Sequence, residues 1–206
     1  MKPHDMPPIG ARIRAQRVGR GMTLRGLARE IGVSASLISQ IETDKAQPSV
    51  STLYAISSAL GVGVEDLMTM AGDGHPQGGS GSDAESSVVR RVGPVVTPEE
   101  RESITLDSGV SWELLGQVPG VPVEFLLVTY APGGASSSTG LLMRHTGTEY
   151  GYLLQGELVL TLGFEDRRLA PGDAVCFESS TPHAYRNEGD RPAVGVWFVR
   201  EGGGAG

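Results

Sequence analysis

Hydrophobic residues recur at helical spacing in the first third of the chain and at strand spacing in its last half. From residue 9 to residue 70, apolar side chains return every three or four positions, which predicts amphipathic helices. From residue 88 to residue 200 they come in short runs separated by turn residues, which predicts strands. A chain of 206 residues is long enough for two domains. The pattern therefore predicts an all-α domain at residues 8–70 and an all-β domain at residues 88–200.

Five short helices are expected in the first domain. They are residues 9–19, two helices between Thr23 and Glu42, then Val50–Leu60 and Val64–Met70. Thr23 and Ser34 are suited to cap two of them, since a hydroxyl can accept a hydrogen bond from the free amides of the first turn. Gly32 and Gly61 can take the positive φ that ends a helix.

The helix that follows Ser34 has two different faces. Its apolar face carries Leu37, Ile38 and Ile41. Its other face is small and polar and carries Ala35, Ser36, Ser39, Gln40 and Thr43. Small polar residues let a helix enter the major groove of DNA, and a glutamine can make a bidentate contact to adenine. The alternative is a helical hairpin used only for packing, although a solvated helix would more often carry Lys and Glu four residues apart.

This region resembles the helix-turn-helix domain of the XRE family, which is lambda-repressor-like. Ala28, Gly32, Val33, Ile38 and Ile41 stand where that family has its small residue, turn glycine and buried positions. The resemblance implies sequence-specific binding to double-stranded operator DNA. The residues expected to contact DNA are Arg17, Thr23, Arg25, Ser34, Ala35, Ser36, Ser39, Gln40, Thr43 and Lys45.

The net charge of −7 is unevenly distributed. Residues 1–70 carry eight Lys and Arg against six Asp and Glu, which gives +2. Residues 71–206 carry nine against eighteen, which gives −9. An acidic chain with one locally basic end can bind DNA through that end.

Two segments have the composition of flexible chain. Residues 71–87 are rich in Gly, Ser and Asp, which predicts a flexible linker, and residues 201–206 are expected to be a disordered tail. No apolar run approaches the length of a membrane helix, and no signal peptide is visible, so no membrane partner is expected. The single cysteine, Cys176, fits a reducing cytoplasm.

Six strands are expected in the second domain. They are Val110–Leu115, Val123–Tyr130, Glu149–Gln155, Leu158–Leu162, Ala174–Phe177 and Ala193–Val199. Turn signals such as Ala170-Pro-Gly-Asp separate them. Many short strands without a long helical period predict an antiparallel sandwich or a closed barrel.

Two motifs in this domain resemble the signature motifs of the cupin superfamily, a small double-stranded β-helix barrel. The first is His145-Thr-Gly-Thr-Glu149 with Gly156 after it, and the second contains Pro171-Gly-Asp and Thr181-Pro-His183-Ala-Tyr-Arg-Asn187. The first histidine of the family's first motif is replaced by Met143.

The resemblance implies a candidate site inside the barrel. His145, Glu149 and His183 would form a two-histidine, one-carboxylate set for one divalent metal ion such as Zn, Fe, Ni or Mn. The same three residues and Tyr185 would line the pocket of a small-molecule effector. The alternative is a set of barrel polar residues that bind each other and a ligand without a metal.

Taken together, the two resemblances imply a transcriptional regulator without enzymatic activity. Its barrel would sense a small molecule and hold a homodimer, and repression is the expected direction. The alternative is a mononuclear non-haem iron enzyme of the same layout, such as an epoxidase that acts on a small phosphonate.

Overall fold

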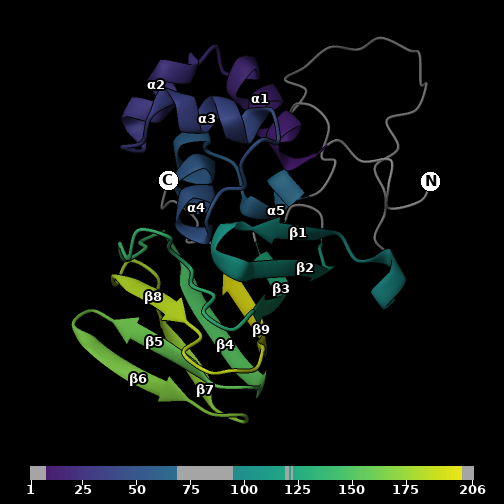
Figure 1. Ribbon diagram of the computed structural model, residues 1–206. Coiled ribbons are helices and arrows are strands. Elements are labelled where there is room, and N and C mark those ends of the chain that lie inside the picture. Colours follow the sequence, from purple (N-terminus) through teal and green to yellow (C-terminus); the bar gives the residue numbers. More distant parts are fainter. Residues whose placement is uncertain (1–7, 69–94, 119–120, 122, 201–206) are drawn as a thin grey trace.

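The computed structural model of the protein describes residues 8–68, 95–118, 121 and 123–200. Its helices form one layer, and the strands curve into a barrel beneath them (Figure 1). The two-domain order of helices followed by strands is confirmed. The predicted linker 71–87, the predicted tail 201–206 and the last two residues of the expected helical domain lie outside the described residues.

Five α-helices precede the first strand in the described residues, as predicted. They are α1 (Ile9–Gly19), α2 (Leu24–Glu30), α3 (Ala35–Glu42), α4 (Val50–Leu60) and α5 (Val64–Met68). Thr23 and Ser34 accept hydrogen bonds from amides three residues further on, so they cap α2 and α3. Gly32 and Gly61 have φ angles of 74° and 61°, the left-handed region that favours glycine. None of the helices in the described part of the chain is long and apolar enough to cross a membrane.

Arg17 lies in the core of the helical domain and not on its surface. Its Nε donates to Glu42 Oε1 at 2.6 Å, and its Nη2 donates to Glu42 Oε2 at 2.8 Å. Its Nη1 donates to the Met22 carbonyl at 2.7 Å. The prediction that Arg17 contacts DNA is therefore wrong, because its guanidinium is held in a buried bidentate pair that joins α1 to the end of α3.

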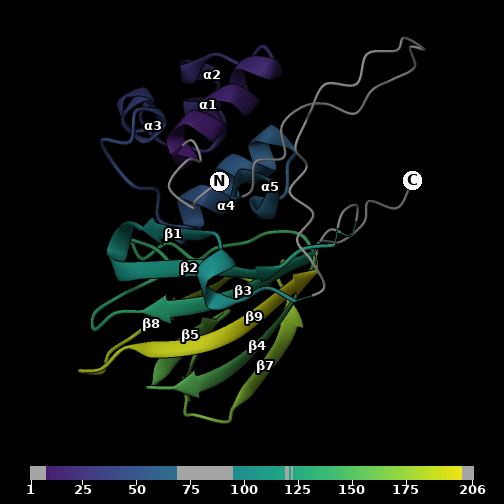
Figure 2. The same ribbon diagram turned by 90° about the vertical axis from the view of Figure 1, so that its right-hand side faces the viewer.

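Nine antiparallel strands follow in the described residues. They are β1 (Ser103–Leu106), β2 (Val110–Gly116), β3 (Val123–Tyr130), β4 (Thr148–Gln155), β5 (Leu158–Leu162), β6 (Glu165–Leu169), β7 (Ala174–Glu178), β8 (His183–Arg186) and β9 (Ala193–Arg200). Six form a sheet in the order β1-β2-β3-β9-β4-β7, and three form a second sheet in the order β6-β5-β8. The two sheets enclose the interior of the barrel (Figure 2).

Three of these strands are not among the six predicted ones, whose ends agree with the structure to within one residue. β1 and β8 have only four residues each, which is too short for a clear alternation. β6 begins Glu-Asp-Arg-Arg, and only Leu169 in it is buried, because it is an edge strand paired to β5 alone. A strand that exposes both faces lacks the apolar period on which the prediction depends.

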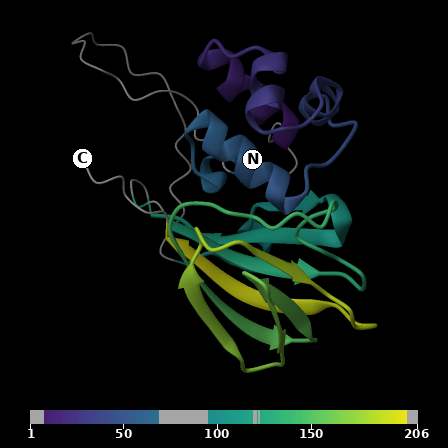
Figure 3. The same ribbon diagram turned by 90° about the vertical axis from the view of Figure 1, so that its left-hand side faces the viewer.

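The helical domain sits directly on one end of the barrel, with α4 next to the strands (Figures 2 and 3). The Ser51 amide donates to the Ser136 carbonyl at 3.0 Å. The Asp107 amide donates to the Pro48 carbonyl at 2.8 Å. Buried apolar residues of both domains form one continuous core. The two domains are therefore packed against each other and are not merely tethered through the chain between them.

Candidate functional site

The polar face of α3 is exposed to solvent, with Ser36, Gln40 and Thr43 exposed along it. Ile38 and Ile41 are buried on the opposite face of the helix. The exposed members of the predicted DNA-binding set are Thr23, Arg25, Ser34, Ser36, Gln40, Thr43 and Lys45. Ala35 and Ser39 are half-buried beside them. The arrangement leaves Ser36 and Gln40, one helical turn apart, free to reach base edges.

Several basic side chains of the helical domain are exposed to solvent. Arg14 on α1, Arg25 and Arg29 on α2, and Lys45 after α3 are all exposed. Exposed Lys and Arg near a recognition helix can contact phosphates and supply the affinity that does not depend on sequence.

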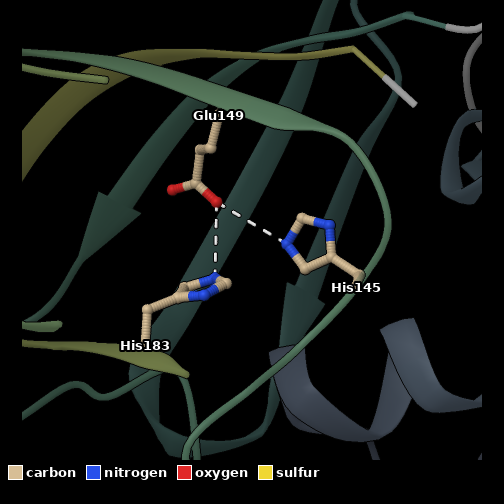
Figure 4. A group of neighbouring side chains, drawn as sticks. All are labelled: His145, Glu149 and His183. Carbon is tan, nitrogen blue, oxygen red and sulfur yellow. Dashed lines mark ion pairs between the residues drawn. The ribbon is translucent and has the colours of Figure 1, made fainter. Parts of the chain in front are cut away.

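Three side chains from the two sequence motifs converge inside the barrel (Figure 4). His145 Nε2 lies 3.6 Å from Glu149 Oε2, and His183 Nε2 lies 3.4 Å from the same oxygen. His145 precedes β4, Glu149 lies in β4 and His183 opens β8. Their three ligand atoms lie within 4.8 Å of one another. Two imidazoles and one carboxylate that face a common point can hold a divalent metal ion.

Strand periodicity explains why Glu149 points inward. On β4, Glu149, Gly151 and Leu153 are buried, whereas Tyr150 and Tyr152 are exposed. Successive side chains of a strand point to opposite faces, so the position of one residue fixes the others.

Glu149 is a buried, ionised carboxylate. Its Oε1 accepts hydrogen bonds from the Tyr185 hydroxyl at 2.7 Å and from Trp197 Nε1 at 3.0 Å. Burial opposes ionisation, but His145, His183 and Tyr185 outweigh it and lower the pKa of Glu149 to about 2. The carboxylate of Glu149 is therefore ionised inside the barrel. Tyr185, one of the predicted pocket residues, donates to it as a neutral hydroxyl, since burial and Glu149 raise the pKa of that hydroxyl.

The histidine nitrogens fit a metal ion. His183 Nδ1 donates to the Thr181 carbonyl at 2.8 Å, which directs the lone pair of Nε2 toward Glu149. Among the described residues, neither His145 Nε2 nor His183 Nε2 has a hydrogen-bond partner, although both are buried. Burial lowers the pKa of His183, but Glu149 outweighs it and raises the pKa above its ordinary value. A metal ion bound to His183 Nε2 would take the place of the proton that this nitrogen carries in the protonated ring.

Met143 occupies the position of the missing motif histidine. It is buried, lines the barrel cavity and exchanges two backbone hydrogen bonds with His183, at 2.7 and 3.0 Å. A thioether is a soft ligand and does not replace an imidazole. The barrel therefore offers three ligands of the nitrogen and carboxylate type.

Sequence reasoning missed two residues that meet at the mouth of the barrel. The hydroxyl of Tyr54, on α4, donates to Glu124 Oε2 at 2.6 Å, and its ring stacks on His145. One signal could have indicated Glu124. It shares strand parity with Leu126 and Val128 on β3, so it is a carboxylate at an inward-facing position. No comparable signal marks Tyr54, whose partners lie in the other domain.

Two family models match separate parts of the chain. A helix-turn-helix model matches residues 13–67, and a cupin domain model matches residues 126–199. Together with the fold, they define the class of the protein. The chain joins a helix-turn-helix domain of the XRE type to a cupin domain.

Its curated relatives are regulators. The chain is similar to the HTH-type transcriptional regulator PuuR of Escherichia coli, with 28% identity over 180 residues that cover 86% of both chains. It is also similar to the HTH-type transcriptional regulator SutR of the same organism, with 25% identity over 187 residues that cover 89% of both. The protein is therefore a DNA-binding transcriptional regulator.

Two solved structures match most of the chain. An HTH_3 family transcriptional regulator from Vibrio cholerae has a TM-score of 0.63, with 18% identity over 95% of this chain and 96% of that one. Hydroxypropylphosphonic acid epoxidase from S. wedmorenis has a TM-score of 0.43, with 19% identity over 94% of this chain and 96% of that one. So distant a likeness gives no support to the iron-enzyme alternative.

Proposed function

We propose that the chain binds a specific operator sequence and that a small-molecule effector in the barrel modulates this binding. One observation supports the proposal most. An exposed, small and polar α3 face and a barrel interior with an ionised carboxylate and two imidazoles belong to one packed unit. Repression is the direction that we expect, and the protein would act in the cytoplasm, where bacterial DNA lies.

Selection of binding sites from random duplex DNA tests this proposal, together with metal analysis of the same purified sample. We expect one family of related sequences to be enriched. Absence of any sequence preference, alongside stoichiometric iron, would overturn the proposal.

We also propose that His145, Glu149 and His183 hold one divalent metal ion, with Zn, Fe, Ni and Mn as candidates. Three protein ligands leave coordination positions free. A bound ion would supply a positive charge to which an oxygen or nitrogen atom of the effector binds. The protein orients the ligands, since Thr181 fixes the His183 ring and Tyr185 holds the far oxygen of Glu149.

Gln40 is expected to read a base. Gln40→Ala should weaken binding to the selected sequence by about 1–3 kcal/mol and leave binding to random DNA almost unchanged. Gln155→Ala is the matched control, because Gln155 is an exposed glutamine at the end of β4. Fluorescence anisotropy with both DNA types measures the difference. Equal loss on both would assign Gln40 a structural role.

A row of aromatic rings is exposed on the outer face of the six-stranded sheet. Phe125, Phe198 and Tyr150 are 40%, 39% and 46% exposed. They lie side by side on β3, β9 and β4, with ring centroids 6.4 and 6.2 Å apart, and Tyr152 is exposed beside them. Large contiguous apolar patches on a protein surface often mark a site where a partner binds. We propose that a second copy of the chain covers this face, since one helix-turn-helix domain alone reads only a few base pairs.

The homodimer proposal predicts the form of the operator. Its half-sites should be related by a two-fold axis and lie about 10 base pairs, or a multiple of that, apart. Phe198→Glu should give monomers that protect a half-site poorly, whereas Phe164→Glu should not, because Phe164 is fully exposed on the turn between β5 and β6. Sedimentation and footprinting measure both effects. A wild-type monomer that protects one half-site would contradict the prediction.

A further inference from the structure

The cavity inside the barrel is too small for an effector as the chain is folded. Its volume is about 20 Å³, which is room for about one water molecule. Glu149, Trp112 and Trp197 line it from the barrel, and Val50 and Tyr54 line it from α4. One wall of the ligand cavity therefore belongs to the DNA-binding domain.

Tyr54 makes three contacts with the barrel at this wall. Its ring stacks on His145 with centroids 4.1 Å apart and planes 5° apart, and it meets Trp112 edge-on at 5.8 Å. Its hydroxyl donates to the buried Glu124 at 2.6 Å. A single side chain of the helical domain thus holds a candidate metal ligand, a tryptophan of the cavity and a carboxylate of β3.

A larger space lies next to the same tyrosine. Tyr54 also lines a crevice of about 340 Å³ between the domains, together with Ser57, Ser58 and Asp66 from the helices and His145 and Thr146 from the barrel. The Tyr54 ring therefore lies between the small barrel cavity that contains Glu149 and the larger crevice between the domains, since it lines both.

We infer that Tyr54 is an internal occupant of the effector site, and that a ligand from the interdomain crevice displaces its ring and thereby loosens α4 from the barrel. The inference rests on the proposed function for the identity of the barrel as the effector site. Tyr54 and a ligand larger than water cannot both occupy the mouth of the barrel. Binding of the ligand therefore favours separation of the domains, and separation of the domains favours binding of the ligand. By linkage, whatever separates the domains also raises the affinity for the ligand to the same extent.

The helical domain would transmit this change as one body. α4 packs against α1, α2 and α5 through a common core that includes Leu53, Ile56 and Leu60. Loosening α4 from the barrel therefore changes the position of α3 relative to the barrel. In a dimer held by the barrels, it changes the distance between the two recognition helices, and with it the fit to a fixed half-site spacing.

The two tryptophans of the chain allow a direct test. Trp112 and Trp197 are the only tryptophans in the sequence, and both line the barrel cavity, so their emission reports this site alone. The probe is acrylamide, which quenches by contact and is larger than the water-sized barrel cavity. Tyr54→Ala should raise the quenching constant several-fold. Tyr54→Phe should give a smaller rise, because the ring still stacks on His145 while the hydrogen bond to Glu124 is lost.

Leu53→Ala is the matched control on the same helix. Leu53 is fully buried in the helical core and does not line the cavity, so its truncation weakens the domain without opening the barrel mouth. We expect quenching close to that of the wild type. An unchanged constant in Tyr54→Ala, or an equal rise in Leu53→Ala, would overturn the inference.

Amide hydrogen exchange tests the separation of the domains. The amides of Ser51 and Asp107 donate across the junction, to Ser136 and Pro48. Both should exchange faster in Tyr54→Ala, whereas the Leu37 amide, which donates to Ser34 within the helical domain, should keep its rate. Increased quenching without faster exchange at the junction would overturn the loosening of α4. No DNA enters either measurement, so failure of operator selection and failure of this inference are distinguishable.

Discussion

Replacing Arg17 by alanine is expected to lower the free energy of unfolding of the helical domain by about 3–5 kcal/mol. The change removes one partner of a buried pair and leaves the carboxylate of Glu42, 6% exposed, without its counter-charge between α1 and α3. It also leaves the Met22 carbonyl without the donor that Arg17 provides. A loss of this size is a large fraction of the stability of a small domain. Urea unfolding followed by the helical circular dichroism signal measures it.

Arg14→Ala is the control for this prediction. Arg14 is an exposed arginine three residues earlier on the same helix, and we expect its replacement to change the free energy of unfolding by less than about 0.5 kcal/mol. Replacing Arg17 and Glu42 together by methionine should restore much of the stability, since an apolar pair leaves no buried charge. If Arg17→Ala unfolds at the urea concentration of Arg14→Ala, the ion pair does not stabilise the domain.

Glu149→Gln is expected to remove the response to effector while leaving operator binding in the effector-free state close to normal. In the wild type, a saturating effector should change operator affinity by a coupling free energy of about 1–3 kcal/mol. The glutamine keeps the shape of the side chain but removes the charge that faces His145 and His183. Loss of an outer-shell partner typically lowers metal affinity about 10–100-fold. Glu149 would be a direct ligand, so we expect the affinity for a divalent ion to fall by more than that. Operator titrations with candidate metabolites and calorimetry with Ni²⁺ measure the two effects.

Glu157→Gln provides the comparison, because Glu157 is an exposed glutamate just after β4. It should keep both the response and the affinity for Ni²⁺. If Glu149→Gln bound Ni²⁺ as tightly as the wild type, Glu149 would not be a metal ligand. If it lost operator binding without effector, the carboxylate would serve the fold and not the sensing of a ligand.

Much of the barrel site could be predicted from the sequence because its signals are local. His145 and Glu149 are four residues apart in one motif, and strand periodicity gives the buried side of β4. His183 and Tyr185 share parity in the second motif, and the structure buries both. Short motifs with fixed spacing specify which side chains share a face, and the antiparallel barrel then brings the two faces together.

The remaining features depend on contacts between distant parts of the chain. Tyr54 is 70 residues from Glu124 and belongs to a helix that reads as an ordinary part of the helical core. Arg17 is 25 residues from Glu42, and a count of basic residues detects its charge but not its partner. In both cases the helix that carries the side chain gives no sign of its role, because that role is decided by a partner far away in the sequence.

The position of Val50 and Tyr54 in the cavity wall also bears on how such proteins can be recombined. A barrel produced without the helical domain would lack both residues, and its cavity would open to water beside Trp112. A chimera that joins this barrel to a foreign DNA-binding module would replace part of the binding pocket as well as the domain that binds the operator. Sensors built by exchanging such domains would keep their ligand preference only if α4 is transferred together with the barrel.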